Sequence, residues 1–374
     1  VLIHRIANLI RFGRASDSED IPGFVTEEDV DFLCDYAAHP AEEGQARAEN
    51  LCALDPAMPW SIIAITFTNK AANELKDRLQ NMLGEQGDGV CAMTFHSACC
   101  RILRRDIDKL GYDSSFTIYD TTDSEKVMKE IIRDMGLDDK TFPAKSVLSA
   151  ISSAKDQMIG PVEYQKNAKA DGDFRAERVG KAYAEYQKRL KASNAVDFDD
   201  IILLTVRLLQ QYEDVRDYYQ RKFRYVLIDE YQDTNNLQYL LSTLLSGRYE
   251  NICVVGDDDQ SIYRFRGATI ENILSFEKQY QGARVIRLEQ NYRSTKYILE
   301  AANAVISHNK GRKGKKLWTD NDQGDKITVY QAYNENEEAN FVSSKILAGL
   351  SKGQHFKDNA VLYRTNAQSN AVEM

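Results

Sequence analysis

The stretch YVLIDEYQDTN, residues 225–235, indicates the fold and the chemistry of this chain most directly. Its first four residues are apolar and predict a buried β-strand, and the carboxylates of Asp229 and Glu230 follow the strand directly. In open α/β sheets, ligands bind outside the carboxyl ends of the strands. Asp229 and Glu230 are therefore candidate Mg²⁺ ligands, since hard cations take oxygen donors, and Glu230 can also orient or deprotonate a water for phosphoryl transfer. The alternative is a strand that ends in two acids without a function.

A second apolar run ends in polar residues in the stretch VVGDDDQSIYRFRGA, residues 254–268. Gln260 in this stretch can contact the γ-phosphate of a nucleotide. Tyr263 and Phe265 can stack on bases, a contact worth about 1–3 kcal/mol per base, while the arginines between them contact phosphates. The alternative is a polar loop whose aromatic side chains belong to the core.

A third stretch, LEQNYRST at residues 288–295, places an arginine soon after another predicted strand. Opposite a magnesium site, Arg293 can neutralise the negative charge that develops on a transferred phosphoryl group. The alternative is an ordinary surface arginine.

Two further stretches, TFTNKAA at 66–72 and TFHS at 94–97, each join a predicted strand to the start of a helix. Backbone N–H groups at a helix N-terminus, together with hydroxyl groups, suit the phosphates of a nucleic-acid backbone. Each stretch also carries a phenylalanine that can meet a base. The alternative is ordinary helix capping, which uses the same residue types.

Strand and helix signals alternate along most of the chain, which predicts an α/β fold with a parallel sheet covered by helices on both faces. Residues 111–192 instead read as helical with no strand, so they are predicted to form an inserted subdomain. The last block is predicted to begin a second α/β domain. The predicted strands cover residues 61–67, 90–95, 225–229, 252–256, 285–288, 327–330 and 360–363.

Composition and charge exclude several classes of protein. No apolar run approaches the roughly 20 residues of a membrane helix, and no signal peptide opens the chain. The six cysteines form no Cys-x-x-Cys pair, which favours free thiols in a reducing compartment and a cytoplasmic location. The formal net charge is −9, but residues 14–57 alone carry twelve acids and two arginines. The rest of the chain is therefore near neutral, and a local basic groove for nucleic acid is allowed.

The five stretches, in this order and at this spacing, resemble the motifs of superfamily 1 helicases of the UvrD/PcrA/Rep type. VDFDDII at 196–202 and AVLYRTNAQSN at 360–370 are also similar to segments of that family, so the resemblance runs over nearly the whole chain. It implies an ATP-dependent helicase that translocates 3′→5′ on single-stranded DNA, unwinds duplex DNA and uses ATP with Mg²⁺.

The resemblance also implies roles for individual residues. Asp229 would help to hold Mg²⁺, and Glu230 would act on the hydrolytic water. Gln260 would couple the γ-phosphate to the DNA site, Arg293 would be the arginine finger, and Tyr292 would pack against the adenine. The residues implied to line the single-stranded DNA track are Thr66, Phe67, Asn69, Thr94, His96, Tyr263, Phe265, Arg266, Arg364 and Asn366. Family members often carry Trp at the position of Phe265, and stacking should survive that change.

The fold implied by the resemblance is a RecA-like P-loop NTPase sheet with a helical insertion and the start of a second RecA-like domain. Residues 1–84 and 193–284 would form the first motor domain (1A), which carries an acidic, partly helical insertion at 14–57. Residues 85–192 would form the helical subdomain (1B). Residues 285–374 would be part of the second motor domain (2A).

One feature of the family is absent from the sequence, which contains no G-x-x-x-x-G-K-[ST] phosphate loop. In the family, a stretch like VLIHRIANLI at 1–10 directly follows that loop. Because the chain also begins with Val1, we expect it to be a piece of a longer protein. The alternatives are a non-catalytic single-strand-binding or regulatory module and the motor part of a helicase-nuclease subunit. The basic run at 310–316 can contact phosphates or form a solvated loop.

Overall fold

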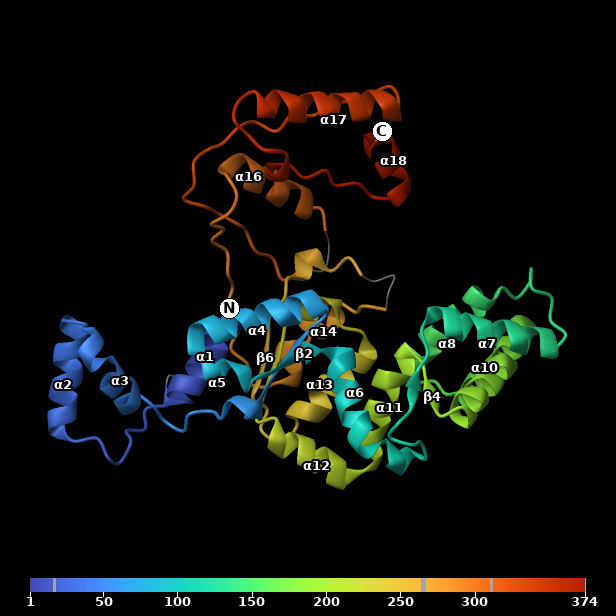
Figure 1. The fold of residues 1–374 in the computed structure, drawn as a ribbon, viewed down its shortest axis with the longest axis horizontal. Coiled ribbons are helices and arrows are strands. Elements are labelled where there is room, and N and C mark those ends of the chain that lie inside the picture. Colours follow the sequence, from blue (N-terminus) through green and yellow to red (C-terminus); the bar gives the residue numbers. More distant parts are fainter. Residues whose placement is uncertain (16–17, 264–266, 310–311, 374) are drawn as a thin grey trace. The chain divides into compact units, whose positions relative to one another are not determined.

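The computed structural model describes residues 1–15, 18–263, 267–309 and 312–373 (Figure 1). The chain divides into two compact units. The first unit comprises residues 1–285 and 311–313, and the second unit comprises residues 286–310 and 314–374. In the part of the chain that the structure describes, no helix is both long enough and apolar enough to cross a membrane.

The first unit is built on a four-stranded sheet with the order β2-β1-β5-β6 (Figure 1). All three strand pairs are parallel, so the four carboxyl ends share one edge of the sheet. The strands are β1 (Ile62–Thr66), β2 (Cys91–Thr94), β5 (Tyr225–Ile228) and β6 (Ile252–Val254).

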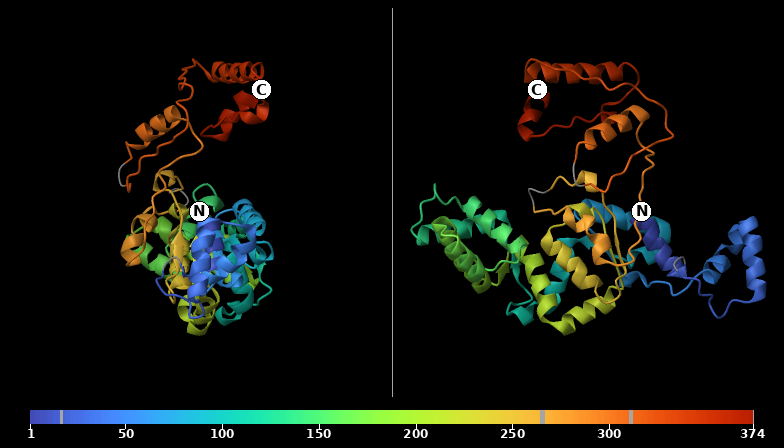
Figure 2. Two further views of the ribbon diagram at one scale, coloured as in Figure 1. Left: turned by 90° about the vertical axis from the view of Figure 1, so that its left-hand side faces the viewer. Right: turned by 180° about the vertical axis from the view of Figure 1, so that it is seen from behind.

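Helices cover both faces of this sheet, as the alternation of side chains along β1 shows. Ile63 and Ile65 pack into one core, whereas Ile62 and Ala64 pack into the other. A central parallel strand must be apolar on both faces for this reason. The first core is completed by α6 (Phe95–Asp106), α11 (Phe198–Gln211), α12 (Glu213–Lys222) and α13 (Asn236–Ser246), and the second by α1 (Leu2–Phe12) and α4 (Asn69–Leu83). These layers can be followed in the turned views of Figure 2.

A helical subdomain lies between β2 and β5 in the sequence and has a core of its own. It contains α7 (Thr121–Asp134), α8 (Ala144–Asp156), α9 (Pro161–Ala170) and α10 (Phe174–Ala192). Two details of the sequence-based prediction are wrong here. A two-residue strand, β3 (Thr117–Ile118), pairs with β4 (Ala195–Val196) where no strand was expected. The subdomain was also expected to start at residue 85, but β2 and α6, which follow residue 85, belong to the main sheet and its core.

The acidic segment 14–57 contains two helices, α2 (Glu27–Ala38) and α3 (Glu42–Leu51). The side chain of Thr26 accepts a hydrogen bond from the Asp29 backbone, and the Asp29 carboxylate accepts one in return from the Thr26 backbone. Such a capping box satisfies two N–H groups that a helix start leaves unpaired. Shorter elements of the first unit are α5 (Glu85–Asp88), α14 (Glu271–Leu274), α15 (Phe276–Gln279) and the 3₁₀ turns η2 (Pro59–Ser61), η3 (Ile107–Leu110), η4 (Tyr231–Asp233) and η5 (Asp258–Gln260).

The second unit contains α16 (Lys296–Ile306), α17 (Glu335–Leu350), α18 (Ser369–Glu373) and the 3₁₀ turns η7 (Phe356–Asp358) and η8 (Asn366–Gln368). The strands predicted at 285–288, 327–330 and 360–363 are wrong, because none of these segments pairs with another strand in the described residues. Apolar side chains in them stay exposed, with Val329 at 91% and Leu362 at 94%. An apolar run becomes a strand only when a neighbour takes up its backbone hydrogen bonds. The α/β class itself is confirmed by the sheet of the first unit.

Candidate functional site

The carboxyl ends of the four parallel strands bring the predicted site residues of the first unit to one edge of the sheet. Ile65 of β1 lies beside Ile228 of β5, and Thr66 lies beside Thr94 of β2. The backbone N–H of Asp229 donates to the Ile65 carbonyl at 3.0 Å, so the pairing continues to the first carboxylate. Segments that are more than 100 residues apart in the sequence therefore meet at this edge.

Asp229 and Glu230 form a carboxylate pair at the end of β5. Burial and the neighbouring charge of Glu230 raise the pKa of Asp229. No lysine or arginine in the described residues pairs with either carboxylate. Two adjacent acids without a basic partner, one of them half-buried, offer the oxygen donors and the negative charge that suit a divalent cation.

The backbone of Glu230 adopts the left-handed conformation, with φ 50° and ψ 41°. This conformation costs roughly 1–2 kcal/mol for a residue with a Cβ. Two backbone hydrogen bonds hold this conformation in place. The Tyr231 N–H donates to the Val255 carbonyl and the Asp233 N–H donates to the Glu230 carbonyl, both at 2.9 Å. The turn directs the Glu230 side chain away from the strand, into an exposed position.

Gln232 connects this carboxylate to the next strand, a contact that sequence reasoning missed. Its side chain is almost completely buried. Its Nε2 donates to Glu230 Oε2 at 2.9 Å, while its Oε1 accepts from the Asp257 backbone N–H at 2.9 Å. One buried amide thus fixes the positions of the β5 and β6 loops relative to each other.

Gln260 lies in η5, in the loop that follows β6. Its Nε2 donates to Asp257 Oδ2 at 2.8 Å, and its side chain is exposed. The loop therefore holds Gln260 on the same edge of the sheet as Glu230 and links it to Gln232 through Asp257.

The three aspartates at 257–259 have carboxylate oxygens within 4.8 Å of one another. Their contacts explain the cluster without a metal. The Arg312 guanidinium donates to both oxygens of Asp259, at 2.7 and 2.6 Å, and the Lys313 backbone N–H donates to Asp258 at 2.8 Å. The phosphate contact considered for the run 310–316 is thus not supported at Arg312, whose charge is used within the protein. Lys310 lies outside the described residues.

The residues that follow β1 and β2 form the other half of the edge. Phe67 packs edge-on against Phe95, with ring centroids 5.5 Å apart. Thr94 caps α6 by accepting the Ser97 N–H at 3.3 Å, and the Thr66 hydroxyl donates to the Thr68 carbonyl at 3.1 Å. Both threonine hydroxyls thus stabilise the turns, while Asn69 at the start of α4 is exposed.

His96 is the titratable group of this half. Burial lowers its pKa, although the carboxylate of Asp199 opposes this shift. Its ring lies edge-on to Phe198, with centroids 5.9 Å apart. His96 is therefore held neutral near pH 7, as a packing and hydrogen-bonding group. Of the predicted aromatic stretch after β6, Tyr263 is exposed, and Phe265 and Arg266 lie outside the described residues.

The predicted residues of the second unit are all exposed. Tyr292 has 79% of its surface accessible, and its hydroxyl donates to Gln290 Oε1 at 2.7 Å. The Arg293 N–H donates to the side chain of Asn291 at 3.0 Å, which shapes the turn but leaves the guanidinium in solvent. Arg364 precedes the η8 turn and Asn366 is its first residue, and the Arg364 N–H donates to Gln368 at 2.9 Å.

Comparison with known proteins agrees with this arrangement. The family model of the UvrD/REP helicase N-terminal domain matches residues 46–281, and that of the UvrD-like helicase C-terminal domain matches residues 286–374. The chain belongs to the UvrD/REP helicase family.

Several members of this family are close in sequence. The ATP-dependent DNA helicase PcrA of Bacillus subtilis (strain 168) is 52% identical over 316 residues, which are 84% of this chain and 42% of that protein. PcrA of Staphylococcus aureus (strain Mu50) is 49% identical over 315 residues, which are 84% of this chain and 43% of that protein. The chain spans less than half the length of these relatives.

In this UvrD/REP family member, a buried ion cluster joins the helical subdomain to α11. The Lys155 ammonium on α8 is completely buried and lies 2.7 Å from Asp197 and 2.8 Å from Asp200. The Tyr186 hydroxyl also donates to Asp197, at 3.0 Å. Burial disfavours the charged lysine, but the two carboxylates outweigh it and keep the pKa of Lys155 above its ordinary value. Both aspartates belong to the segment VDFDDII, and Lys155 lies 42 residues before Asp197 in the sequence.

The next residue, Asp156, connects α8 to two loops at the candidate site. Its carboxylate accepts a hydrogen bond from Asn235 Nδ2 at 2.9 Å, in the loop that follows Glu230. The Asp156 carboxylate also lies against Gly267, whose φ is +83°. A Cβ added to Gly267 would lie 2.9 Å from Asp156 Oδ2. Burial and the nearby charge of Asp199 raise the pKa of Asp156 to about 6. The helical subdomain is thereby in direct contact with the loops after β5 and β6.

Proposed function

We propose that the chain is the motor part of an ATP-dependent DNA helicase that translocates 3′→5′ on single-stranded DNA. The observation that carries this proposal is the single sheet edge that brings Asp229, Glu230 and Gln260 together with Phe67 and His96. Membership of the UvrD/REP family supports it, as does the PcrA activity named for the relatives. Within this proposal, the sheet of the first unit is motor domain 1A, the helical subdomain is 1B and the second unit belongs to motor domain 2A.

The nucleotide side of the edge is proposed to be the loop that follows β5. Asp229 is proposed to hold Mg²⁺, which when bound would offset negative charge on the phosphates. Glu230 is proposed to orient the attacking water and accept its proton, because it is exposed and its carboxylate is fixed by Gln232.

Coupling of nucleotide and DNA is proposed to pass through Gln232, Asp257 and Gln260. Gln260 donates to the Asp257 carboxylate, the Asp257 backbone N–H donates to Gln232, and Gln232 donates to Glu230, so hydrogen bonds link Gln260 to Glu230. The same loop then continues to Tyr263 and to the predicted DNA contacts Phe265 and Arg266. Any movement of Gln260 toward a γ-phosphate would displace this loop.

The DNA side is proposed to use stacking and backbone contacts. Phe67 and Tyr263 offer ring faces or edges to bases, and His96, Asn69 and the helix starts after Thr66 and Thr94 offer polar contacts to the strand. In the second unit, Arg364 and Asn366 are proposed to contact the same strand. Tyr292 is proposed to stack on the adenine, and Arg293 to act as the arginine finger, consistent with their exposure.

The test is the Glu230→Gln substitution in the full-length protein. The amide keeps the size of the side chain but cannot accept a proton from water. We expect ATP binding to change less than threefold and the ATPase kcat to fall at least a hundredfold. A Glu271→Gln variant, on the short helix α14, is the matched control and should keep kcat. An ATPase activity of Glu230→Gln equal to that of wild type would refute the proposal.

A further inference from the structure

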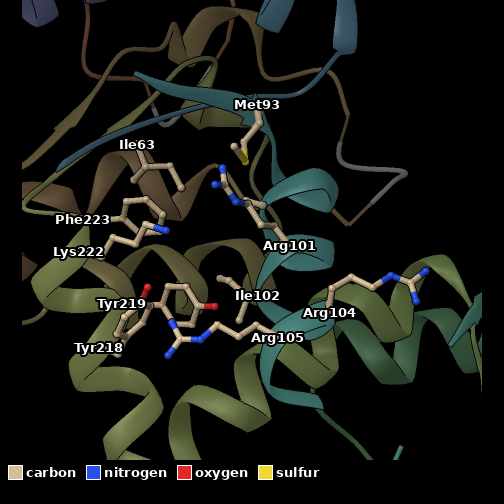
Figure 3. A pocket seen from close by; sticks show the side chains of 11 residues that line it. Ile63, Met93, Arg101, Ile102, Arg104, Arg105, Tyr218, Tyr219, Lys222 and Phe223 are labelled. Atoms are coloured by element: carbon tan, nitrogen blue, oxygen red, sulfur yellow. The ribbon is translucent and has the colours of Figure 1, made fainter. Parts of the chain in front are cut away.

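A cavity of about 280 Å³ opens between α6 and α12 in the first unit (Figure 3). Four of its eleven lining residues are cations, three are aromatic and none is acidic. The floor is apolar and reaches Ile63 of β1 and Met93 of β2. Such a concentration of positive charge is notable in a chain whose net charge is −9.

The cavity is separate from the candidate catalytic edge. On α6, which begins at the carboxyl end of β2, Arg101 and Arg105 lie about 9 and 15 Å along the helix from Phe95. Lys222 and Phe223 precede β5 and so lie at its amino end, opposite Asp229. None of the residues assigned above to nucleotide or DNA lines this cavity.

Two of the four cations are already used within the protein. Arg104 donates to the Ser114 carbonyl at 2.7 Å and lies over the Phe116 ring. Arg105 lies 3.4 Å from the centroid of the Tyr218 ring and 3.7 Å from Asp106. These contacts hold Arg105 and Tyr218 as one stacked wall of the cavity.

The other two cations, Arg101 and Lys222, have no acidic partner. Within the described part of the chain, the Arg101 guanidinium has no hydrogen bond or ion pair, and Lys222 contacts only the rings of Tyr218 and Phe223, at 5.9 and 5.5 Å. Figure 3 shows the Arg101 head group near Met93 and the Lys222 head group beside Phe223, both turned toward the space between α6 and α12. A guanidinium and an ammonium that share one cavity without a carboxylate form a site for an anion.

We propose that this cavity binds a phosphate-bearing nucleotide unit, with Arg101 and Lys222 on the phosphate. The base would lie against the Tyr218 ring, which is 41% exposed, since stacking on aromatic side chains tolerates any base. The volume is near the lower end of small-ligand pockets, about 300 Å³, which suits one nucleotide. The unit can come from a nucleic-acid strand or from a free nucleotide. This assignment does not depend on the proposed helicase activity.

The experiment is photo-cross-linking of the full-length protein to a short single strand that contains 5-iodouracil, with the labelled peptides mapped by mass spectrometry. We expect cross-links at Tyr218, Tyr219 or Phe223. The double variant Arg101→Gln/Lys222→Gln should lose them at least tenfold and lower the salt dependence of binding, the slope of log Kd against log [salt], by about 0.7, for the one phosphate that the two cations share. The matched control, Arg221→Gln, removes one charge from the same helix outside the cavity and should keep them within twofold.

Competitors distinguish the two sources. Displacement by excess AMP as well as by unlabelled strand identifies a free-nucleotide site, whereas displacement by the strand alone identifies a strand site, and both results support the proposal. Equal displacement by a polyglutamate peptide overturns it in favour of an acidic protein partner. Cross-links only at Phe67, His96 or Tyr263 also overturn it but leave the proposed DNA track intact. Cross-links at the cavity alone support it and contradict that track, and no cross-links at all refute both.

Discussion

The buried charge of Lys155 gives the sharpest prediction about stability. The Lys155→Met substitution keeps an unbranched side chain of similar length but removes the only cation within ion-pair distance of Asp197 and Asp200 in the described structure. Two adjacent carboxylates would then remain in a site where the lysine head group has no exposed surface. Breaking a buried ion pair by removing one partner costs about 3–5 kcal/mol. This is a large part of the roughly 5–15 kcal/mol that stabilises a typical domain.

Hydrogen–deuterium exchange of the amides in α8, α10 and α11 measures this loss locally. A loss of about 3–5 kcal/mol corresponds to exchange that is roughly 150- to 4,000-fold faster at pH 7.5. The difference should shrink as the pH falls through about 6, because burial raises the pKa of Asp200 to about 6 even beside Lys155, and the unpaired carboxylates then take up protons. Lys188→Met is the control, since Lys188 is 79% exposed and its nearest acid, Glu185, lies 3.9 Å away. It should change the free energy by less than about 1 kcal/mol.

A compensated variant separates charge from packing. Adding Asp197→Asn and Asp200→Asn to Lys155→Met removes both unpaired charges, and Asn can still cap α11 at position 197. Most of the lost protection should return. An exchange rate of Lys155→Met within fivefold of the wild-type rate at pH 7.5 would refute the reasoning. A triple variant that exchanges as fast as Lys155→Met would also refute it.

Three further predictions concern residues at the candidate site. Gln232→Ala should lower the ATPase kcat about a hundredfold with little change in KM, because the Glu230 carboxylate loses its support; an unchanged kcat in steady-state assays would contradict this. Asp156 has a pKa raised to about 6, so the folded protein binds a proton there more tightly than the unfolded chain, and this contribution to stability is lost as pH rises from about 4 through 6. Asp156→Asn should therefore raise Tm more at pH 7.5 than at pH 4.5, and equal shifts would argue against it. Gly267→Ala should lower the free energy of unfolding by roughly 1–2 kcal/mol because Gly267 has a positive φ, and an unchanged value in urea unfolding would contradict this.

The part of the fold that could be predicted from sequence is the part with strong local signals. The apolar runs of β1, β2, β5 and β6 marked buried strands, and the polar residues directly after them predicted the shared edge. Asp229 and Glu230 could be found because a parallel sheet places all its carboxyl ends together. Composition predicted an acidic, partly helical insertion at 14–57, and the structure places α2 and α3 there.

What could not be predicted depends on contacts between distant segments. Gln232 looked like one polar residue among several, and only the pairing of β5 with β6 shows that it connects their loops. Lys155 carried no signal, since its partners come from another helix. For Arg312 the sequence left a phosphate contact and a solvated loop open, and only the fold shows its ion pair with Asp259. The apolar runs of the second unit failed as strands for the same reason, because pairing is a property of neighbours rather than of one segment.

The most direct test of the central claim is steady-state ATP hydrolysis by the full-length protein with and without single-stranded DNA, for wild type and for Gln260→Ala. If the edge of the sheet couples nucleotide to DNA, wild-type hydrolysis should rise at least tenfold with DNA. The Gln260→Ala variant should still bind the strand but lose most of that stimulation. A wild-type hydrolysis rate that does not change with DNA, or a variant rate that DNA stimulates as fully as in the wild type, would contradict the claim.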